Sequence, residues 1–162
     1  MGAGAVGCWI GGRLQAAGAQ VTFVGRRRVL DELRTAGLQG SDLDGGSFRL
    51  LPQQLDLHEQ IEGPAPSLVL LCVKSGATAE AARQLARALP SGTPVLSLQN
   101  GIGNVAVARE AAPSLRWVAG MVPFNIARIG PGHWHRGTTG RLAAQDDPSL
   151  HAALPLFEAA GL

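Results

Sequence analysis

The sequence predicts an α/β fold of the doubly wound type, with a mainly parallel sheet that lacks its first strand. A glycine-rich turn, GAGAVG, occupies residues 2–7. Segments of helical and of extended character alternate after it. A continuous apolar run, SLVLLCV at residues 67–73, is typical of a strand that is buried on both faces of a parallel sheet. Together these observations favour helices packed on both faces of a parallel sheet.

The first part of the chain has the order of a dinucleotide-binding unit. Apolar residues at helical spacing predict a helix over 5–17, and Gly18 suits its carboxyl end. A short β-rich segment follows at 20–25, so glycine turn, helix and strand come in the order of a Rossmann-like unit. In such a unit the turn follows a buried strand of about five residues. One residue precedes Gly2, so we expect a sheet without that strand and with exposed strand edges beside the gap.

The rest of the chain continues the alternation. An Asp44-Gly45 turn between two short extended runs predicts a small hairpin insert. Residues 125–144 hold a Gly-Pro-Gly turn and further extended pieces. Apolar periodicity, glycines and prolines predict helices over 28–36, 75–89, 104–111 and 149–160, and strands over 67–73, 93–98 and 115–121.

Composition excludes several classes of protein. A length of 162 residues suits one domain with a real core. The net charge of +2, without a basic stripe interleaved with aromatic residues, argues against a nucleic-acid partner. The sequence has no apolar run of about 18 residues and no signal-peptide pattern at its start, so we expect no membrane segment and a cytoplasmic protein.

The glycine turn predicts a dinucleotide ligand. The first glycine allows the tight turn, the second lets the backbone approach the pyrophosphate, and the third lets helix and strand pack closely. The alternative is the start of an Ala/Gly-rich helix in a glycine-rich protein. The expected cofactor contacts in this turn are Gly2, Ala3, Gly4, Ala5, Val6 and Gly7.

The residues that follow the β-rich segment at 20–25 favour NADP(H) over NAD(H) as the ligand. An NAD site usually has a carboxylate there for the ribose 2′-hydroxyl, whereas an NADP site uses arginine for the 2′-phosphate. The sequence here is Gly25-Arg26-Arg27-Arg28, without a carboxylate. Arg26 is the expected phosphate contact, because a guanidinium fork matches a phosphate dianion. A solvated basic helix start is the alternative.

Two polar residues follow successive predicted strands. Lys74, the only lysine of the chain, follows the strand at 67–73, and Asn100 follows the strand at 93–98. Open α/β sheets bind ligands at the carboxyl ends of their strands. Lys74 could therefore contact the cofactor, and Asn100 could hold a carbonyl or hydroxyl near the hydride donor. A surface lysine and an Asn-Gly turn are the alternatives.

His133 and His135 flank Trp134 beside the Gly-Pro-Gly turn. Such a pair could ligate a metal, but residues two apart share one side of any strand. Because no third ligand lies nearby in the sequence, we expect no metal site and a structural or surface role.

With these residues in place, the chain resembles the N-terminal domain of the ketopantoate reductase (2-dehydropantoate 2-reductase) family. The most specific part is SLQNGIGN at 97–104, supported by CVKSGAT at 72–78, by the glycine turn and by Arg26. The resemblance extends from Gly2 to the end of the chain. It implies that residues 1–162 form one NADP-binding domain.

The resemblance also implies an activity, the NADPH-dependent reduction of the C2 ketone of ketopantoate to pantoate, in pantothenate and coenzyme A biosynthesis. It makes Arg26 a 2′-phosphate contact, Lys74 a cofactor contact and Asn100 a residue between cofactor and substrate, with residues 121–126 beside the nicotinamide. The family's proton-donating lysine belongs to a helical C-terminal domain that also supports a homodimer. This sequence ends before that domain, so we expect the chain by itself to be inactive. The alternatives are a reductase for another 2-keto acid and a non-catalytic NADP-binding module.

Overall fold

The structure, a computed structural model, describes residues 1–162. The helices are α1 (Ala5–Ala16), α2 (Arg27–Ala36), α3 (Thr78–Ala88), α4 (Asn104–Ala111) and α5 (Leu154–Ala159), with 3₁₀ turns η1 (Pro52–Gln54), η2 (Ser75–Ala77) and η3 (Pro148–Ala153). The strands are β1 (Thr22–Val24), β2 (Leu38–Asp42), β3 (Ser47–Leu50), β4 (Asp56–His58), β5 (Val69–Leu71), β6 (Pro94–Ser97), β7 (Arg116–Met121), β8 (Ile126–Gly130), β9 (His133–Arg136) and β10 (Ala143–Ala144). None of the helices combines the length and the apolar character that a membrane-spanning segment requires.

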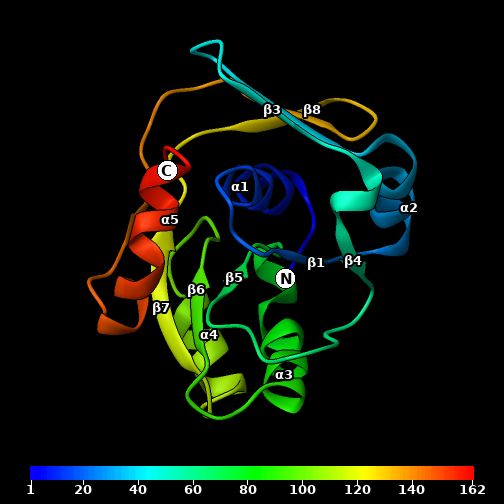
Figure 1. Cartoon of the computed structure of the whole chain (residues 1–162). Coiled ribbons are helices and arrows are strands. Elements are labelled where there is room, and N and C mark those ends of the chain that lie inside the picture. The colour runs from blue at the N-terminus through cyan, green and yellow to red at the C-terminus, as the bar shows by residue number, and fades with distance from the viewer.

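Helix α1 lies at the centre of the molecule, between two layers of strands (Figure 1). On one side is a four-stranded mixed sheet in the order β3-β2-β9-β8. On the other side are the parallel strands β1, β4, β5, β6 and β7, and helices α3 and α4 cover their far face. The helix is therefore apolar around most of its circumference, and Trp9 and Ile10 are fully buried.

Two adjacent glycines let α1 approach both layers. A β-carbon at Gly11 would lie 2.7 Å from the ring of Phe23 on β1. A β-carbon at Gly12 would overlap the ring of Phe48 on β3. Because larger side chains would force the layers apart, the glycine pair determines how closely the two sheets enclose the helix.

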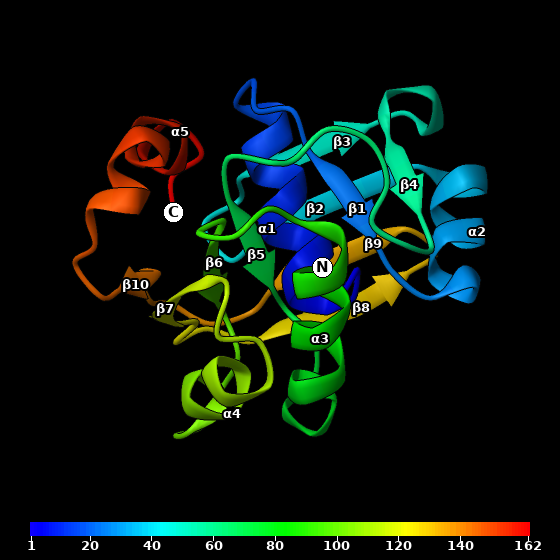
Figure 2. The ribbon, with the colours of Figure 1, turned by 90° about the horizontal axis from the view of Figure 1, so that it is seen from below.

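The parallel layer is divided into two pieces. Strands β5, β6 and β7 form one piece, with β10 antiparallel at its edge, and β1 pairs only with β4. Between β1 and β5 lies the amino terminus of the chain (Figure 2). The Met1 amino group donates to Leu70 O (2.9 Å), Cys72 N–H donates to Met1 O (2.9 Å) and Gly2 N–H donates to Val24 O (2.8 Å). Residues 1 and 2 thus mark the place of the predicted missing strand, and its two neighbours lack a partner along the rest of their edges.

Most predicted elements are confirmed. The helix at 104–111 agrees residue for residue, and the first helix ends one residue early. The predicted helix at 75–89 begins as the 3₁₀ turn η2, and the one at 149–160 is divided into η3 and α5. Strand β4 was not predicted. It forms a parallel pair with β1 over only three residues.

The predicted hairpin about Asp44-Gly45 is confirmed, because β2 and β3 pair in antiparallel fashion on either side of this turn. The sequence did not predict its partner: β2 also pairs in parallel with β9. The two hairpins together make the four-stranded layer over α1. The reason is hydrophobic, since this layer buries Leu38 and Trp134 against the central helix.

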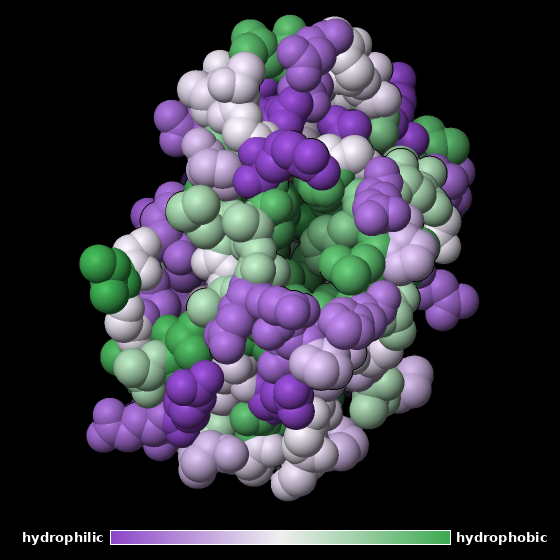
Figure 3. All heavy atoms as spheres, turned by 90° about the vertical axis from the view of Figure 1, so that its left-hand side faces the viewer, coloured by the Kyte–Doolittle hydropathy of each residue, from purple (hydrophilic) through white to green (hydrophobic).

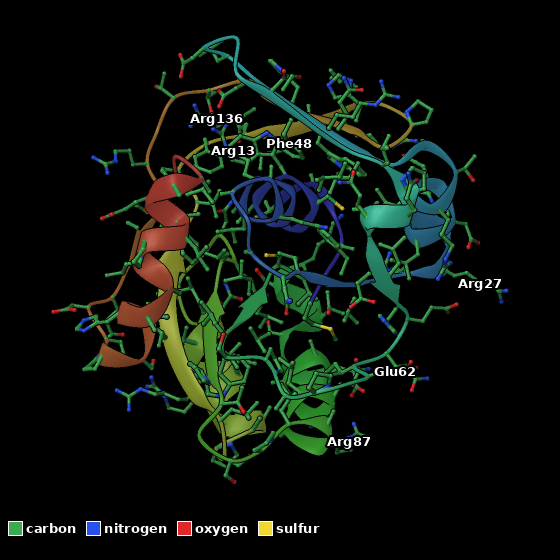
Figure 4. The ribbon with its side chains drawn as sticks, viewed as in Figure 1. Arg13, Arg27, Phe48, Glu62, Arg87 and Arg136 are labelled. Atoms are coloured by element: carbon green, nitrogen blue, oxygen red, sulfur yellow. The ribbon has the colours of Figure 1, made fainter.

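A shared carboxylate connects this layer to α1. Asp42 accepts from Arg13 (2.8 Å) and from Arg136 (2.7 Å), and the guanidinium groups of both arginines lie over the Trp9 ring. Arg13 also donates to the carbonyl of Ala160, just after α5. Figure 4 shows Arg13 and Arg136 beside the four-stranded sheet β3-β2-β9-β8, on the side of α1. Buried charges of this kind need such pairing because desolvation is costly.

Candidate functional site

The candidate site residues lie at one edge of the parallel layer. Strands β5, β6 and β7 run in parallel, so their carboxyl ends share an edge. Residues 1 and 2 connect Val24, at the end of β1, to Cys72, just after β5. Arg26, Lys74 and Asn100 each follow one of these strand ends and are exposed. The fold therefore brings the predicted residues to the edge where open α/β sheets bind ligands.

The three glycines of the turn have three different environments. Gly2 has a φ of +95°, and a β-carbon there would lie 2.7 Å from Val73 N. A β-carbon at Gly7 would overlap the Gly2 carbonyl oxygen, and it would lie 3.3 Å from the Cys72 β-carbon. At Gly4, by contrast, no atom lies within 4 Å of the β-carbon position. The first and third glycines thus serve the fold, and the second leaves open space outside the turn.

The N-terminus of α1 faces that open space with free donors. No side chain caps the helix, and its first intrahelical bond is from Cys8 N–H to Gly4 O. The N–H groups of Ala5, Val6 and Gly7 therefore have no partner within the helix. Free N–H groups and the positive end of the helix dipole attract an anion such as a pyrophosphate.

Arg26 stands beside this turn. A β-carbon at Gly25 would lie 2.6 Å from the Ala3 β-carbon, so the end of β1 packs directly against the turn. Arg26 is the N-cap of α2 in extended conformation, and it makes no ion pair within the chain. Its neighbour Arg27 lies 3.8 Å from a carboxylate oxygen of Glu59. Of these two arginines, Arg26 is therefore the one without a carboxylate partner in the chain.

The loops that carry Lys74 and Asn100 are tied together by a buried polar network. Gln99 is 7% exposed and donates to Val73 O (2.9 Å) and to Thr78 Oγ1 (2.7 Å). Its own amide oxygen accepts from Ser97 Oγ (3.0 Å). Because these bonds span the ends of β5 and β6, Gln99 holds the two loops in one arrangement.

Further contacts complete the connection between the loops. Ser75 Oγ donates to Asn100 O (3.2 Å), and Asn104 Nδ2 donates to the same carbonyl (3.0 Å). The side-chain amide of Asn100 and the ammonium group of Lys74 have no hydrogen-bond partner in the chain, which leaves both available to a ligand. Lys74 and Asn100 were predicted from the sequence, but Gln99 was not. The position of Gln99 directly before Asn100, in the LQNG segment, was the signal that could have identified it.

Burial controls the ionisation of the groups behind the turn. It raises the pKa of the Cys8 thiol to about 12 and that of the Cys72 thiol to about 11. It also lowers the pKa of the Met1 amino group. Both thiols are therefore protonated and poorly nucleophilic at neutral pH.

A second ionisable group lies at the end of β4. His58 contacts Asp56 (2.6 Å) and Glu62 (3.1 Å), and the hydrogen bond to Asp56 is the main reason why the pKa of His58 is raised. Its carbonyl accepts from Gly25 N–H, just before Arg26. His58 thus belongs to the strand that pairs with β1 directly before Arg26.

His133 and His135 lie on one side of β9, as the alternation predicts. His133 Nε2 and His135 Nδ1 both contact Ser41 Oγ on β2, at 3.0 and 2.9 Å. Nowhere in the chain do three His, Cys, Asp or Glu side chains gather in a way that could hold a metal ion. The two histidines on β9 and Ser41 on β2 thus connect the two hairpins of the four-stranded sheet.

These features are compatible with a dinucleotide site. No atom lies within 4 Å of the β-carbon position at Gly4, the first N–H groups of α1 have no partner within the helix, and Arg26 has no carboxylate partner. Lys74 and Asn100 lie along the same edge of the sheet.

Comparison with known proteins agrees with this geometry. The 2-dehydropantoate 2-reductase of Halobacterium salinarum is 34% identical over 167 residues, covering 99% of this chain and 54% of that protein. The crystal structure of a PanE/ApbA family ketopantoate reductase from Ralstonia eutropha superimposes with a TM-score of 0.85 and 32% identity, over 100% of this chain and 53% of that one. The corresponding values for the 2-dehydropantoate 2-reductase of Geobacter metallireducens are 0.84 and 29%, over 100% and 55%.

The chain spans about half the length of these relatives. The family model described as ketopantoate reductase PanE/ApbA matches residues 1–148, which is most of the chain. The chain therefore belongs to the ketopantoate reductase PanE/ApbA family of oxidoreductases.

Proposed function

We propose that the chain is the NADP(H)-binding half of a reductase that acts on a 2-keto acid, most specifically 2-dehydropantoate, in pantothenate biosynthesis. The observation that carries the proposal is the open space at Gly4, at the N-terminus of α1, whose first N–H groups have no partner within the helix. The names of the similar proteins support the substrate. The same family resemblance supports a cytoplasmic location and a homodimeric reductase.

Each part of the site has a separate role in this proposal. NADPH, when bound, supplies the hydride for reduction of the ketone. The N–H groups of Ala5, Val6 and Gly7 bind the pyrophosphate, and Arg26 binds the 2′-phosphate. Contacts at these two places would orient the cofactor along the edge of the sheet.

Lys74 and Asn100 act further along that edge. The free Asn100 amide can donate to the carbonyl of a keto acid and accept from the hydroxyl of the product. The Lys74 ammonium is suited to a cofactor oxygen, because it is a compact charge without a carboxylate partner in the chain. The Gln99 network keeps the loops of both residues at a constant separation.

We expect the 162-residue chain to bind the cofactor without significant turnover. Reduction of a ketone needs a proton donor at the developing alkoxide. The family resemblance assigns this role to a lysine of a C-terminal domain, whereas Lys74, the only lysine of this chain, is proposed as a cofactor contact. The absence of a positioned general acid typically reduces the rate by about two to four orders of magnitude. A rate with NADPH and 2-dehydropantoate close to that of a complete relative would contradict this expectation.

The cofactor preference can be tested by fluorescence titration of the chain with NADPH and with NADH. We expect tighter binding of NADPH. Arg26→Ala should weaken NADPH binding by about 10- to 100-fold, the equivalent of one charge-assisted phosphate contact, and should leave NADH binding unchanged. Arg34→Ala is the matched control, because it removes the same charge from the carboxyl-terminal part of the same helix. NADH binding as tight as or tighter than NADPH binding in the parent chain would refute the role of Arg26.

A further inference from the structure

A histidine at the end of β4 lies between two carboxylates. His58 Nε2 contacts Asp56 Oδ1 (2.6 Å), and His58 Nδ1 contacts Glu62 Oε2 (3.1 Å). Asp56 belongs to the same strand, whereas Glu62 lies in the segment of residues 59–63, which has neither helix nor strand. Figure 4 shows Glu62 on the side of the molecule that carries Arg27 of α2. The imidazole ring thus joins the end of a strand to the loop that leaves it.

The two contacts together require the protonated ring. An ionised carboxylate accepts hydrogen bonds and has none to donate, and a neutral imidazole has a single N–H group. Only the imidazolium can donate to Asp56 and to Glu62 at the same time. In the neutral ring one nitrogen would direct its lone pair at a carboxylate oxygen, which is repulsive. The observed arrangement therefore belongs to one charge state of His58.

Loss of the proton should break the contact with Glu62 and keep the contact with Asp56. The Asp56 contact is the shorter one, and Asp56 Oδ2 also accepts from Thr22 Oγ1 on β1. Residues two apart on a strand share one side, so Asp56 stays beside the ring. The Glu62 side chain is 64% exposed, and its contact with His58 is its only hydrogen bond in the chain. The neutral ring should therefore keep its remaining proton on Nε2.

The other charged groups near the ring do not replace these partners. Strand β1 contributes the Thr22 hydroxyl, which bonds to Asp56. Helix α2 packs against β4, and its charged side chains that contact this region or each other have partners other than His58. They are Arg27 (Glu59, 3.8 Å), Arg34 (Leu57 O, 3.4 Å) and Asp31 (Arg34, 2.7 Å). The two carboxylates also raise the pKa of His58, mainly through the hydrogen bond to Asp56, so the ring loses its proton above the ordinary value of 6.5.

We propose that His58 is a pH-dependent latch for residues 59–63, closed while the ring is protonated and open once Nδ1 has lost its proton. In the closed state Glu62 is held on the ring, and Glu59 of the same segment lies near Arg27. In the open state Glu62 turns to solvent, and Glu59 is free to leave Arg27. The latch therefore changes the charge beside the three consecutive arginines that follow β1. It does not depend on the proposed cofactor.

NMR spectroscopy of the chain between about pH 5.5 and about pH 8.5, on either side of the ordinary histidine value, tests the latch. At the lower pH we expect both ring nitrogens of His58 to be protonated and a nuclear Overhauser effect between the ring and the Glu62 side chain. At the higher pH the ring nitrogen shifts should report the Nε2–H tautomer, and the Overhauser effect should be lost. The heteronuclear Overhauser effect of the Glu62 and Gly63 backbone amides should fall over the same pH range, with one midpoint above 6.5.

Substitution of Glu62 tests whether its carboxylate makes the latch pH-dependent. Glu62→Gln offers both a donor and an acceptor, so its amide can bond to the neutral ring as well as to the charged one. The contact with His58 should then persist across the pH range, and the loss of order in residues 59–63 should disappear. Glu59→Gln is the matched control, because it makes the same change in the same segment at a residue that pairs with Arg27 and not with His58. It should leave the release at its parental midpoint.

His151 serves as an internal reference in the same titration. It lies in η3 and has one carboxylate contact, to Asp146 (3.4 Å). The turn η3 and helix α5 lie on the opposite side of the molecule from β4, on the face where hydrophilic side chains surround an apolar hollow (Figure 3). Because a single contact can be kept in either charge state, the titration of His151 should not release its segment.

Four results would overturn the proposal. The first is an Overhauser effect between His58 and Glu62 that persists unchanged at the higher pH, and the second is a neutral His58 ring protonated on Nδ1. The third is a parental pH dependence in Glu62→Gln, or its loss in Glu59→Gln. The fourth is an equal loss of order around His151, because it would show a general loosening of the chain with pH.

Discussion

Two single substitutions in the glycine turn should separate folding from cofactor binding. Gly7 packs against the Gly2 carbonyl and close to Cys72, whereas the β-carbon position of Gly4 faces open space. Gly4 also has a φ of −105°, which alanine adopts without strain. We therefore expect Gly7→Ala to destabilise the fold and Gly4→Ala to weaken NADPH binding with little effect on folding.

The magnitudes follow from these contacts. A β-carbon at Gly7 can reach an ordinary C···O separation of about 3.3 Å only if α1 moves away from the turn. Overpacking of this kind costs about 3 kcal/mol. At Gly4 the cost is the weaker N-cap propensity of alanine, about 1 kcal/mol or less. The added methyl group, however, displaces the pyrophosphate from at least one N–H donor. A loss of about 1.5–3 kcal/mol for a hydrogen bond to a charged group corresponds to about 10- to 150-fold in Kd.

Urea unfolding and NADPH fluorescence titration measure the two effects on the same samples. The expected pattern is a large loss of stability for Gly7→Ala, and a near-parental unfolding midpoint with weakened binding for Gly4→Ala. Parental NADPH affinity in Gly4→Ala would refute the assignment of the open space to the cofactor. A parental midpoint for Gly7→Ala would refute the packing argument.

Four further predictions concern stability. Asp42→Ala leaves two arginines without their shared carboxylate and should cost about 3–5 kcal/mol in urea unfolding, whereas Asp44→Ala, whose side chain is 74% exposed, should cost less than about 0.5 kcal/mol. Gln99→Met removes the three hydrogen bonds that the Gln99 amide makes with Val73 O, Thr78 Oγ1 and Ser97 Oγ, and it should cost about 2–4 kcal/mol. An unchanged unfolding midpoint would show that the network is replaceable. The buried Met1 amine binds its proton more weakly in the folded chain than in the unfolded one. The free energy of unfolding should therefore rise as the pH approaches 8.0. N-terminal acetylation removes the titrating group and should abolish this rise. Above about pH 9 stability should fall, because the two cysteines keep their protons only when folded.

Local signals explain which elements were predictable from the sequence. The helix at 104–111 begins after Gly101 and Gly103 and ends before Pro113, so its bounds are marked by residue types alone. The glycine turn and the buried strand before Lys74 have equally local signatures. These elements gave the fold class and brought Arg26, Lys74 and Asn100 to one edge of the sheet.

Long-range pairing explains what was missed. Strand β4 has three residues and a half-exposed surface, and only its contact with β1 makes it a strand. The pairing of β2 with β9 joins segments more than 90 residues apart. Neither segment carries a sequence signal that identifies the other as its partner. Gln99 was missed for a related reason. A polar residue at a strand end looks exposed until the ends of two strands and Thr78 enclose it.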